Sequence, residues 1–595
     1  MQVTRAKGPS SSTARAAAPK ARVRPEEAEA PIRVCPVPGL SQGSVPAFLR
    51  VRSRIQWWRE HAQDPEVLHL ILHGVGFDWV GPDLPVASQG KGHSPQEVAA
   101  AATILREYEE AGAVCRPPPP FAPRYVIPWF VISKPEGEGQ KHRLISDCRV
   151  LNQFLQPKHF RLDHIGNVFP MLRKGMWGAK VDLKNAYFHL ELHPNLKDYV
   201  CLDVGGVLYR FEASCFGLST LPELFMKLMK VFLRKWRLQG FQVFVYLDDI
   251  LLIASSRAQL QTHLQVVRTD LQDAGMVVNE KKSLLEPAQE IPFLGFMLDL
   301  RRGLLCVPAG KLKAVRKELG KFLTHPFLSC RKVAAILGAT RALLPAVPFL
   351  RCFTDLMVAF TDQHRWAGWD KRLPVSEALV AQAKETKSLF VHWVGRPFQD
   401  DRPVRQLHAD ASNEGWAGID STGQGGIQEF WRDQKDKHKN WKELWASIST
   451  VLSFAKPGEL VQIHVDNSVA YSYLKKLGGR KQPFNDMLRP LVRHLISQKI
   501  LLEPLLVPSA EQKADALSRW SKDPGDYTLD TGIFTQIQKN FAPFINPWVD
   551  MFASPGNAKY PHFVCRWPHW QAWACNALEM DLSDVGDCYA NPPGR

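Results

Sequence analysis

The sequence predicts a mixed α/β protein that consists of several domains. Its 595 residues correspond to roughly three to five domains of about 150 residues each. Short β-rich runs alternate with helical stretches from Tyr125 to about Leu305, a helical pattern begins at Lys311, and strands and helices mix again from about Arg405 to Trp520. Hydrophobic residues make up 45% of the chain and charged residues 23%, which excludes a wholly disordered or fibrous protein.

An excess of basic side chains indicates a polyanionic partner. The chain has 75 Lys and Arg against 59 Asp and Glu, for a formal charge of +16, and nucleic acid is the first candidate for such a partner. No segment has the roughly 18 consecutive apolar residues that cross a membrane, so no membrane partner is expected. The eleven cysteines are scattered without a CxxC pair, which indicates a reduced intracellular protein, in the nucleus or the cytoplasm.

The N-terminal region, residues 1–92, is basic, and its first half is expected to be disordered. Its first 25 residues carry six basic side chains and no acidic one, a composition that fits either a transit peptide or a nucleic-acid-binding arm. A helix is predicted from Ser94 to Ala111, because Ser94 and Glu97 form a capping box and Gly112 can end the helix. The further predicted domains are residues 93–305, a helical connection at 306–400, a third domain at 401–525 and a C-terminal segment at 526–595.

Three aspartates in the second domain form a first candidate site. Asp248 and Asp249 stand between the strand-like runs Phe241–Tyr246 and Ile250–Ile253, a pattern typical of a hairpin with its acids at the tip. Asp182 ends another strand-like run. Three carboxylates at strand ends can hold a pair of Mg²⁺ ions about 3.5–4 Å apart, as in nucleotidyl transfer. By itself the "YLDD" stretch fits an ordinary surface hairpin tip equally well.

Several separated stretches give this region a resemblance to the reverse transcriptases of retroelements. They occur in the family's order between about Tyr125 and Leu305. The resemblance implies a right-hand polymerase of fingers, palm and thumb, with Asp182, Asp248 and Asp249 as metal ligands for RNA-templated DNA synthesis. The matching stretches are "FVISKPEGEGQKHRLISDCRVLN", "VDLKNAYF", "CFGLSTLPELFMKLM", "VYLDD", "NEKKS" and "FLGF".

The resemblance also assigns three basic residues to the incoming nucleotide. Lys134 and Arg143 match the residues that grip the triphosphate, and Lys282 matches the position proposed to protonate pyrophosphate. Such cations offset the charge of the β- and γ-phosphates and of the leaving group. Taken singly, Lys134 is an ordinary solvated loop lysine, and Lys281 could serve as well as Lys282.

Aromatic and small residues complete the implied nucleotide site. Tyr187 falls where the family keeps an aromatic gate against the ribose 2′-hydroxyl, although a core aromatic is the alternative. Phe216, Gly217 and Pro222 match the motif beneath the nucleotide and template, and Phe293–Phe296 resembles the primer grip. The basic helix that begins near residue 311 would then be a thumb that follows the template–primer backbone, although a solvated helix face explains its charges equally well.

Four acids in the third domain form a second candidate site. Asp410 and Asp466 end strand-like runs, whereas Glu443 and Asp515 lie in helical stretches. Four carboxylates from two strands and two helices can hold two metal ions that activate water against an RNA phosphodiester. Any one of these acids alone would be an ordinary surface residue.

The surroundings of these acids resemble the ribonuclease H domain that follows reverse transcriptase in many retroelements. The matching stretches are "HADASNEGWAGI", "HVDNSVAYSYLKKLGG" and "ADALSRW". One departure concerns the stretch before the last acid, which usually reads His-Ile-Pro-Gly. It reads "LVPS" in this sequence, with Leu506 where the histidine would sit. A mobile proton shuttle is therefore missing from the pattern.

The C-terminal segment has a different character. "VDMFASPGNAKYPHFVCRWPHW" is followed by "CYANPPGR", in which Asn591 begins an Asn-Pro-Pro sequence. Together these stretches resemble the methyltransferase-like segment of DIRS-like, tyrosine-recombinase retrotransposons, and a Pro-rich turn is the alternative. The segment is expected to be truncated and, without a glycine-rich methyl-donor loop, to transfer no methyl group.

The prediction is therefore a retroelement RNA-directed DNA polymerase with a ribonuclease H domain. The expected cofactors are two Mg²⁺ or Mn²⁺ ions per active site. The expected partners are an RNA template, a DNA primer, an RNA–DNA hybrid and dNTPs, and the oligomeric state stays open. The alternative is a decayed or host-captured fragment that binds nucleic acid without turnover. Leu506 and the abrupt C-terminus favour that alternative, and the intact polymerase acids oppose it.

Overall fold

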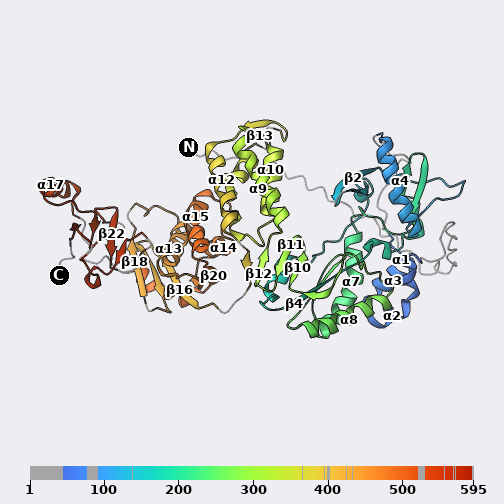
Figure 1. Ribbon diagram of the computed structural model, residues 1–595, viewed down its shortest axis with the longest axis horizontal. Helices are drawn as coiled ribbons and strands as arrows, with labels where there is room; N and C mark the ends of the chain where they lie inside the picture. Colours follow the sequence, from blue (N-terminus) through green and yellow to red (C-terminus); the bar gives the residue numbers. More distant parts are fainter. Residues whose placement is uncertain are drawn as a thin grey trace, which may run out of the picture.

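The computed structural model has the mixed α/β architecture that the sequence predicts. Figure 1 shows an elongated molecule with the N-terminal elements at one end and the C-terminal sheets at the other. Its middle contains the helices α9 (Ala309–Thr324), α10 (Cys330–Arg341) and α12 (Glu377–His392). None of the described helices is long and apolar enough to cross a membrane. The structure describes residues 45–76, 92–136, 139–364, 366, 368–393, 395–398, 402–423, 425–431, 433–519, 529–554, 557–566, 569, 571–583 and 585–591.

Three short N-terminal helices pack against the following domain. Trp58 is fully buried, and its indole Nε1 donates a hydrogen bond to the carbonyl of Ala274 at 3.0 Å. The Arg52 guanidinium pairs with Glu191. The expected disorder of residues 1 to about 45 concerns residues outside the described ones, apart from Val45. The three helices are α1 (Ala47–Ser53), α2 (Ile55–His61) and α3 (Pro65–His73).

The predicted helix near residue 94 is confirmed. It is α4 (Pro95–Glu110), whose N-cap Ser94 forms the capping box with Glu97. It packs against the hairpin of β2 (Trp129–Glu136) and β3 (Gly139–Ser146). The neighbouring elements are β1 (Val114–Cys115), η1 (Leu151–Gln153), α5 (Ile165–Val168), η2 (Phe169–Met171), η3 (Ala186–His189), α6 (Pro194–Lys197), β5 (Cys201–Val204) and β6 (Val207–Phe211).

The central element of the second domain is an antiparallel sheet in the strand order β7-β8-β4-β9, which we call the palm sheet. Residues 250–253 are almost completely buried, which explains why their stretch is an unbroken apolar run instead of an alternating one. Helix α7 packs on β7, and α8 packs on β4 and β8. The bounds are β4 (Trp177–Asp182), α7 (Leu221–Leu238), β7 (Gln242–Tyr246), β8 (Asp249–Ala254), α8 (Arg257–Asp273) and β9 (Leu284–Ala288).

A helical connection follows the palm sheet. The predicted basic helix is α9 (Ala309–Thr324), and it buries Val315, Leu319 and Phe322 on one face, as its periodicity requires. The strands around it form a sheet in the order β10-β11-β12-β15 and the pair β13-β14. The other elements are β10 (Glu290–Phe293), β11 (Phe296–Asp299), β12 (Leu304–Cys306), β13 (Phe327–Ser329), α10 (Cys330–Arg341), η4 (Pro348–Arg351), α11 (Asp355–His364), β14 (Arg372–Pro374), α12 (Glu377–His392) and β15 (Arg396–Pro397).

The third domain has a mixed sheet in the order β18-β17-β16-β19-β20. Strands β16, β17 and β18 are antiparallel, whereas β19 pairs in parallel with both β16 and β20. Helix α13 lies against β16 and β17. The elements are β16 (Val404–Ala411), β17 (Gly415–Asp420), β18 (Gly425–Phe430), α13 (Lys439–Phe454), β19 (Leu460–Val465), α14 (Ser468–Lys476), α15 (Gln482–Ser497), β20 (Leu501–Leu506), η6 (Ser509–Glu511) and α16 (Asp515–Ser518).

The C-terminal segment forms a small sheet whose strands all pair in parallel, in the order β23-β22-β21-β24. Asp550 is buried on β21, and burial raises the pKa of its carboxyl group. Asn591 is exposed, and the two prolines after it lie outside the described residues. The elements are α17 (Thr531–Phe541), β21 (Val549–Asp550), β22 (His562–Cys565), β23 (Ala574–Cys575), η7 (Ala577–Glu579) and β24 (Cys588–Tyr589).

A buried polar cluster joins the connection to the third domain. The carboxylate of Asp355, at the start of α11, accepts hydrogen bonds from Gln382 Nε2 at 2.5 Å, Asn485 Nδ2 at 3.1 Å and Arg489 Nη2 at 2.7 Å. Gln382 lies on α12, whereas Asn485 and Arg489 lie on α15. A single buried acid therefore ties three helices together.

We predict that Asp355→Ala lowers the free energy of unfolding by about 3 kcal/mol, because it leaves the largely buried Arg489 guanidinium without its buried partner. Asp486→Ala is the matched control, since Asp486 pairs with the same guanidinium from an exposed position and such a pair contributes about 0–1 kcal/mol. Urea unfolding followed by tryptophan fluorescence measures both. Equal effects of the two substitutions would contradict the prediction.

Candidate active sites

The palm sheet brings the three predicted polymerase aspartates to one edge. The antiparallel register sets Asp182, the last residue of β4, opposite Asp249, the first residue of β8. Asp248 lies in the two-residue turn between β7 and β8, and its carbonyl accepts a hydrogen bond from the amide of Leu183 at 3.0 Å. The predicted hairpin with its acids at the tip is confirmed.

The turn itself has an unusual backbone conformation. Leu247 has a φ of +56°, in the region that normally favours glycine at the first position of a two-residue hairpin turn. A left-handed conformation at a non-glycine residue costs on the order of 1 kcal/mol, and such residues gather at functional sites. The buried neighbours Val245 and Ile250 hold both strands in place, so the sheet imposes this conformation on the turn.

Burial makes these carboxylates costly to ionise. It raises the pKa of Asp182, where the Lys282 charge opposes the shift and the Asp249 charge reinforces it. Burial also raises the pKa of Asp248, with further contributions from the charges of Asp249 and Asp182. Clustered acids that repel one another in a partly buried place form a donor set that suits a hard divalent cation.

A lysine lies among these acids. Lys180, two residues before Asp182 on β4, places its Nζ 2.7 Å from Oδ1 of Asp249. Sequence reasoning did not single out this residue. The spacing of two along a strand, which puts Lys180 and Asp182 on one face, is the signal that would have found it.

Tyr187 lies beside the acids, on η3. Its ring is buried, 4.8 Å from the ring of Phe216 and edge-on to Phe225 at 5.9 Å. Burial, reinforced by the charge of Asp248, raises the pKa of Tyr187 to about 12. The side chain is thus a packed aromatic near a candidate metal ligand, and Phe216 remains 48% exposed beside it.

The predicted basic residues lie in different surroundings. Lys134 is on β2, but its side chain lies outside the described part of the structure. Arg143 is exposed on β3. Lys282 is also exposed, and its charge lowers the pKa of Asp182. Among the cations that act on this carboxyl group, Lys282 has the largest effect on its pKa.

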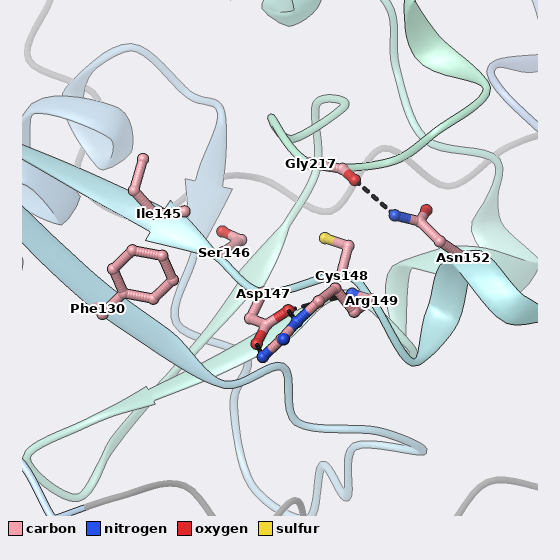
Figure 2. Close-up of a pocket in the computed structure, with 8 residues that line it drawn as sticks. All are labelled: Phe130, Ile145, Ser146, Asp147, Cys148, Arg149, Asn152 and Gly217. Carbon is pink, nitrogen blue, oxygen red and sulfur yellow. Dashed lines mark hydrogen bonds and ion pairs between the residues drawn. The ribbon is translucent and has the colours of Figure 1, made fainter. Parts of the chain in front are cut away.

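Gly217 borders a cavity of about 430 Å³ between the β2–β3 hairpin and the segment before α7 (Figure 2). It has a φ of +112°, and a Cβ there would lie 2.8 Å from the carbonyl oxygen of Ser146. Its carbonyl accepts a hydrogen bond from Asn152 Nδ2 at 2.9 Å. Figure 2 also shows Asp147 paired with Arg149 among the residues that line this cavity. The glycine therefore allows a close backbone approach that a larger residue would prevent.

The second site is more compact. Asp410 on β16, Glu443 on α13 and Asp466 directly after β19 place one carboxylate oxygen each within 4.8 Å of one another. Among the described residues, no other group of three acidic, histidine or cysteine side chains brings its ligand atoms this close together. The three palm aspartates therefore lie farther apart than these acids. The parallel pairing of β16 with β19 explains the convergence, because parallel strands end at the same edge.

Two oxygens in this cluster are available to a cation. Oε1 of Glu443 and Oδ1 of Asp466 are buried and accept no hydrogen bond. The ammonium of Lys439 lies 3.7 Å from Glu443 Oε1. Burial, and then the charges of Asp410 and Asp466, raise the pKa of Glu443 to about 8. Orphaned buried carboxylate oxygens fit a divalent metal.

The fourth predicted acid and the predicted histidine position lie outside this cluster. Asp515 begins α16 and forms an ion pair with Arg519 at 2.7 Å. Burial raises the pKa of Asp410 and the Ser518 hydrogen bond lowers it, and the charge of Asp515 makes a smaller contribution that raises it. Leu506 is half exposed at the end of β20, where it pairs with Val465. Leu506 lies beside the acid cluster without a titratable group.

Two serines that sequence reasoning missed bind the acids directly. Ser509 Oγ donates to Oδ2 of Asp466 at 2.7 Å, and Ser518 Oγ donates to Oδ2 of Asp410 at 2.6 Å. Ser518 follows Asp515 by three residues, the spacing that places two side chains on one helix face. Each hydroxyl leaves the other oxygen of its carboxylate for another ligand.

The region around the palm sheet matches a known protein family. Residues 132–298 match the family described as "Reverse transcriptase (RNA-dependent DNA polymerase)". This stretch includes Asp182, Asp248 and Asp249. The chain contains a reverse transcriptase domain.

Viral and transposon polyproteins are similar to part of this chain. Over 297 residues it is 26% identical to the genome polyprotein of Petunia vein clearing virus (isolate Shepherd). This alignment covers 49% of the chain and 12% of the relative. It is 24% identical over 312 residues to the enzymatic polyprotein of Cestrum yellow leaf curling virus, which covers 50% and 44%. It is 27% identical over 172 residues to the retrovirus-related Pol polyprotein from transposon 297 of Drosophila melanogaster, covering 29% and 16%. The chain spans less than half the length of these relatives.

A solved structure of the foamy viral protease-reverse transcriptase dRH in complex with double-stranded DNA superimposes with a TM-score of 0.48 at 14% identity. The superposition covers 80% of this chain and 84% of that chain.

We predict that the metal-free protein becomes less stable as the pH rises from about 4.5 to 8, because of Glu443. The folded state holds this carboxyl protonated up to about pH 8, whereas the unfolded chain ionises it near its ordinary value of 4.5. The unfolded state therefore binds fewer protons in this range, and the stabilisation present below pH 4.5 is lost as the pH rises to 8. The loss is on the order of a few kcal/mol.

Glu443→Gln removes this loss, because the amide is neutral at every pH. Thermal unfolding in EDTA at pH 5 and pH 8 measures it, and the midpoint of the variant should fall less than that of the wild type. Glu414→Gln is the control, since Glu414 is exposed. Parallel pH profiles of Glu443→Gln and the wild type would refute the assignment.

Proposed function

We propose that this protein is the RNA-directed DNA polymerase of a retroelement and also degrades the RNA strand of RNA–DNA hybrids. The observation that carries the proposal is the strand register that sets Asp182 opposite Asp249, with Asp248 in the adjoining turn, inside the stretch that matches the reverse transcriptase family. A shared edge for three acids is what nucleotidyl transfer by two metal ions requires.

Asp182, Asp248 and Asp249 would hold the Mg²⁺ or Mn²⁺ ions of the polymerase site. When bound, these ions lower the pKa of the primer 3′-hydroxyl and offset the charge of the attacked phosphate. Lys134 and Arg143 bind the β- and γ-phosphates.

Two further side chains act at the ends of the nucleotide. Lys282 carries the proton that the departing pyrophosphate receives, and its charge already acts on Asp182. Tyr187 and Phe216 form the aromatic wall beside Asp248. The Tyr187 ring excludes a ribose 2′-hydroxyl, which selects dNTPs, and Gly217 leaves room for the template beneath them.

Asp410, Glu443 and Asp466 would hold the metal ions of the ribonuclease H site. When bound, these ions supply activated water for attack on the RNA phosphodiester. The two buried oxygens without a hydrogen-bond partner, Glu443 Oε1 and Asp466 Oδ1, support this role. Asp515 contributes at the rim, where Arg519 now holds it. The proposed substrates of the whole chain are an RNA template, a DNA primer, dNTPs and the hybrid that synthesis leaves behind, with basic helix α9 along the backbone.

The subtype proposed from the tail is a DIRS-like retrotransposon. The parallel sheet β23-β22-β21-β24 is consistent with a methyltransferase-like segment, since parallel sheets are typical of α/β nucleotide-binding folds. We assign it no methyl transfer.

A second candidate function is binding of nucleic acid without turnover. Leu506, at the end of β20 beside Asp466, favours this alternative because it cannot shuttle a proton. The alternative and the main proposal differ in whether the chain extends a primer.

We predict that Asp248→Asn abolishes primer extension on an RNA template and leaves cleavage of the RNA strand nearly unchanged. Asp466→Asn should do the reverse, because separate carboxylate clusters serve the two reactions. Each loss should be at least about 10³-fold, as expected when a group that acts only in the transition state is removed. Extension and hybrid-cleavage assays on the same preparations measure both effects.

Wild-type protein that binds hybrid but extends no primer would favour the alternative without turnover. Loss of both activities in either single variant would argue against two independent sites.

We predict that Tyr187→Ala raises incorporation of ribonucleotides relative to deoxyribonucleotides by at least about tenfold, because it removes the ring beside Asp248. Tyr187→Phe is the matched control and should keep the selectivity, since it retains the ring and loses only the hydroxyl. Single-nucleotide extension with rNTP and dNTP measures the ratio. Unchanged selectivity in Tyr187→Ala would remove the gate role.

A further inference from the structure

Lys180 is a cation built into the polymerase acid cluster. Alternate residues of a strand point to the same face, so Lys180 and Asp182 share one face of β4. Asp249 lies directly opposite Asp182 and diagonally across from Lys180, a separation that long side chains bridge. The Lys180 ammonium forms a 2.7 Å ion pair with Asp249 Oδ1, and both side chains are about four-fifths buried.

The pair differs from an ordinary surface salt bridge in its surroundings. The Lys180 charge also acts on Asp182 and Asp248, where it lowers both carboxyl pKa values against the effect of burial. One ammonium therefore acts on three carboxylates, and the four groups together carry a formal charge of −2 when all are ionised.

The second site offers a comparison within the same molecule. Its nearest lysine, Lys439, is largely exposed and stands 3.7 Å from Glu443. There, three carboxylate oxygens approach within 4.8 Å, and two buried oxygens have no hydrogen-bond partner. In the palm site, Lys180 engages Asp249 directly and the three acids do not reach that distance. The palm acids, which lie farther apart, are thus the ones in direct contact with a lysine.

We infer that Lys180 is a positioning residue that neutralises Asp249 in the metal-free enzyme and must release it when divalent cations bind. The inference rests on the proposed polymerase site. Removing the lysine charge should have two opposite consequences. The metal-free protein loses the neutralising partner of a partly buried carboxylate, and a cation that enters no longer competes with the ammonium.

The test measures Mn²⁺ binding rather than catalysis. Binding is followed by the electron paramagnetic resonance signal of free Mn²⁺, in a full-length chain that carries Asp410→Asn and Asp466→Asn to silence the second site. In this background Lys180→Met should bind Mn²⁺ about tenfold more tightly, a change that corresponds to about 1.4 kcal/mol. Its melting midpoint in EDTA should be lower than that of the parent chain, and saturating Mn²⁺ should close the gap.

Matched variants separate a specific role from a general effect of charge. Lys180→Arg keeps the charge and should retain the parent affinity. Lys184→Met removes an exposed lysine from the other side of Asp182 and should change the affinity less than twofold. Lys180→Gln, a smaller change in packing, should reproduce the effect of Lys180→Met.

Two failures are distinguishable. If Asp248→Asn leaves Mn²⁺ binding unchanged in this background, the proposed metal site itself fails. If binding depends on Asp248 but neither Lys180→Met nor Lys180→Gln changes it, or if both variants are equally destabilised with and without Mn²⁺, Lys180 has only a structural role and the inference is overturned.

Discussion

Negative charge at the ends of buried strands is the constraint on which both candidate sites depend. Acids at the ends of buried apolar strands lie where water cannot fully solvate a carboxylate. In the palm, the run 250–253 is buried and Asp248 and Asp249 precede it directly. In the third domain, Asp410 and Glu443 are almost completely buried. Each site must therefore obtain positive charge or protons from its surroundings.

The two sites meet this requirement differently. The palm site uses a resident ammonium, Lys180, whereas the second site holds Glu443 protonated up to about pH 8 and uses serine hydroxyls as donors. A divalent cation would replace a lysine contact in the first case and a proton in the second. The two acid clusters therefore share carboxylate donors and differ in the groups that offset their negative charge.

The rest of the molecule holds these two edges in place. The N-terminal helices pack against α7 and the end of α8 through Trp58, and the Asp355 cluster ties the connection to α15 of the third domain. Both contacts join segments far apart in the chain, 216 residues in the first case and 130 in the second. Buried polar groups with several partners favour one arrangement over others, so such contacts define how the domains meet.

Local patterns predicted much of this architecture. The capping box at Ser94, the hairpin at Asp248 and the buried face of α9 were all predictable, because each depends on neighbours within a few residues. The same holds for Asp182, Asp410 and Asp466 at strand ends. Asp515 was grouped with the other three acids through the stretch "ADALSRW". In the structure it pairs with Arg519, and its charge acts on Asp410.

The sequence by itself determined which residues carry charge, where the strands and helices begin, and that the chain resembles a reverse transcriptase. Only the tertiary structure decided how those charges are shared. The lysine that faces Asp249, the serines that donate to Asp410 and Asp466, and the raised pKa of Glu443 all arise from side chains brought together across strands. Electrostatic energy depends on distance and on burial, and neither quantity is written in the order of residues along the chain.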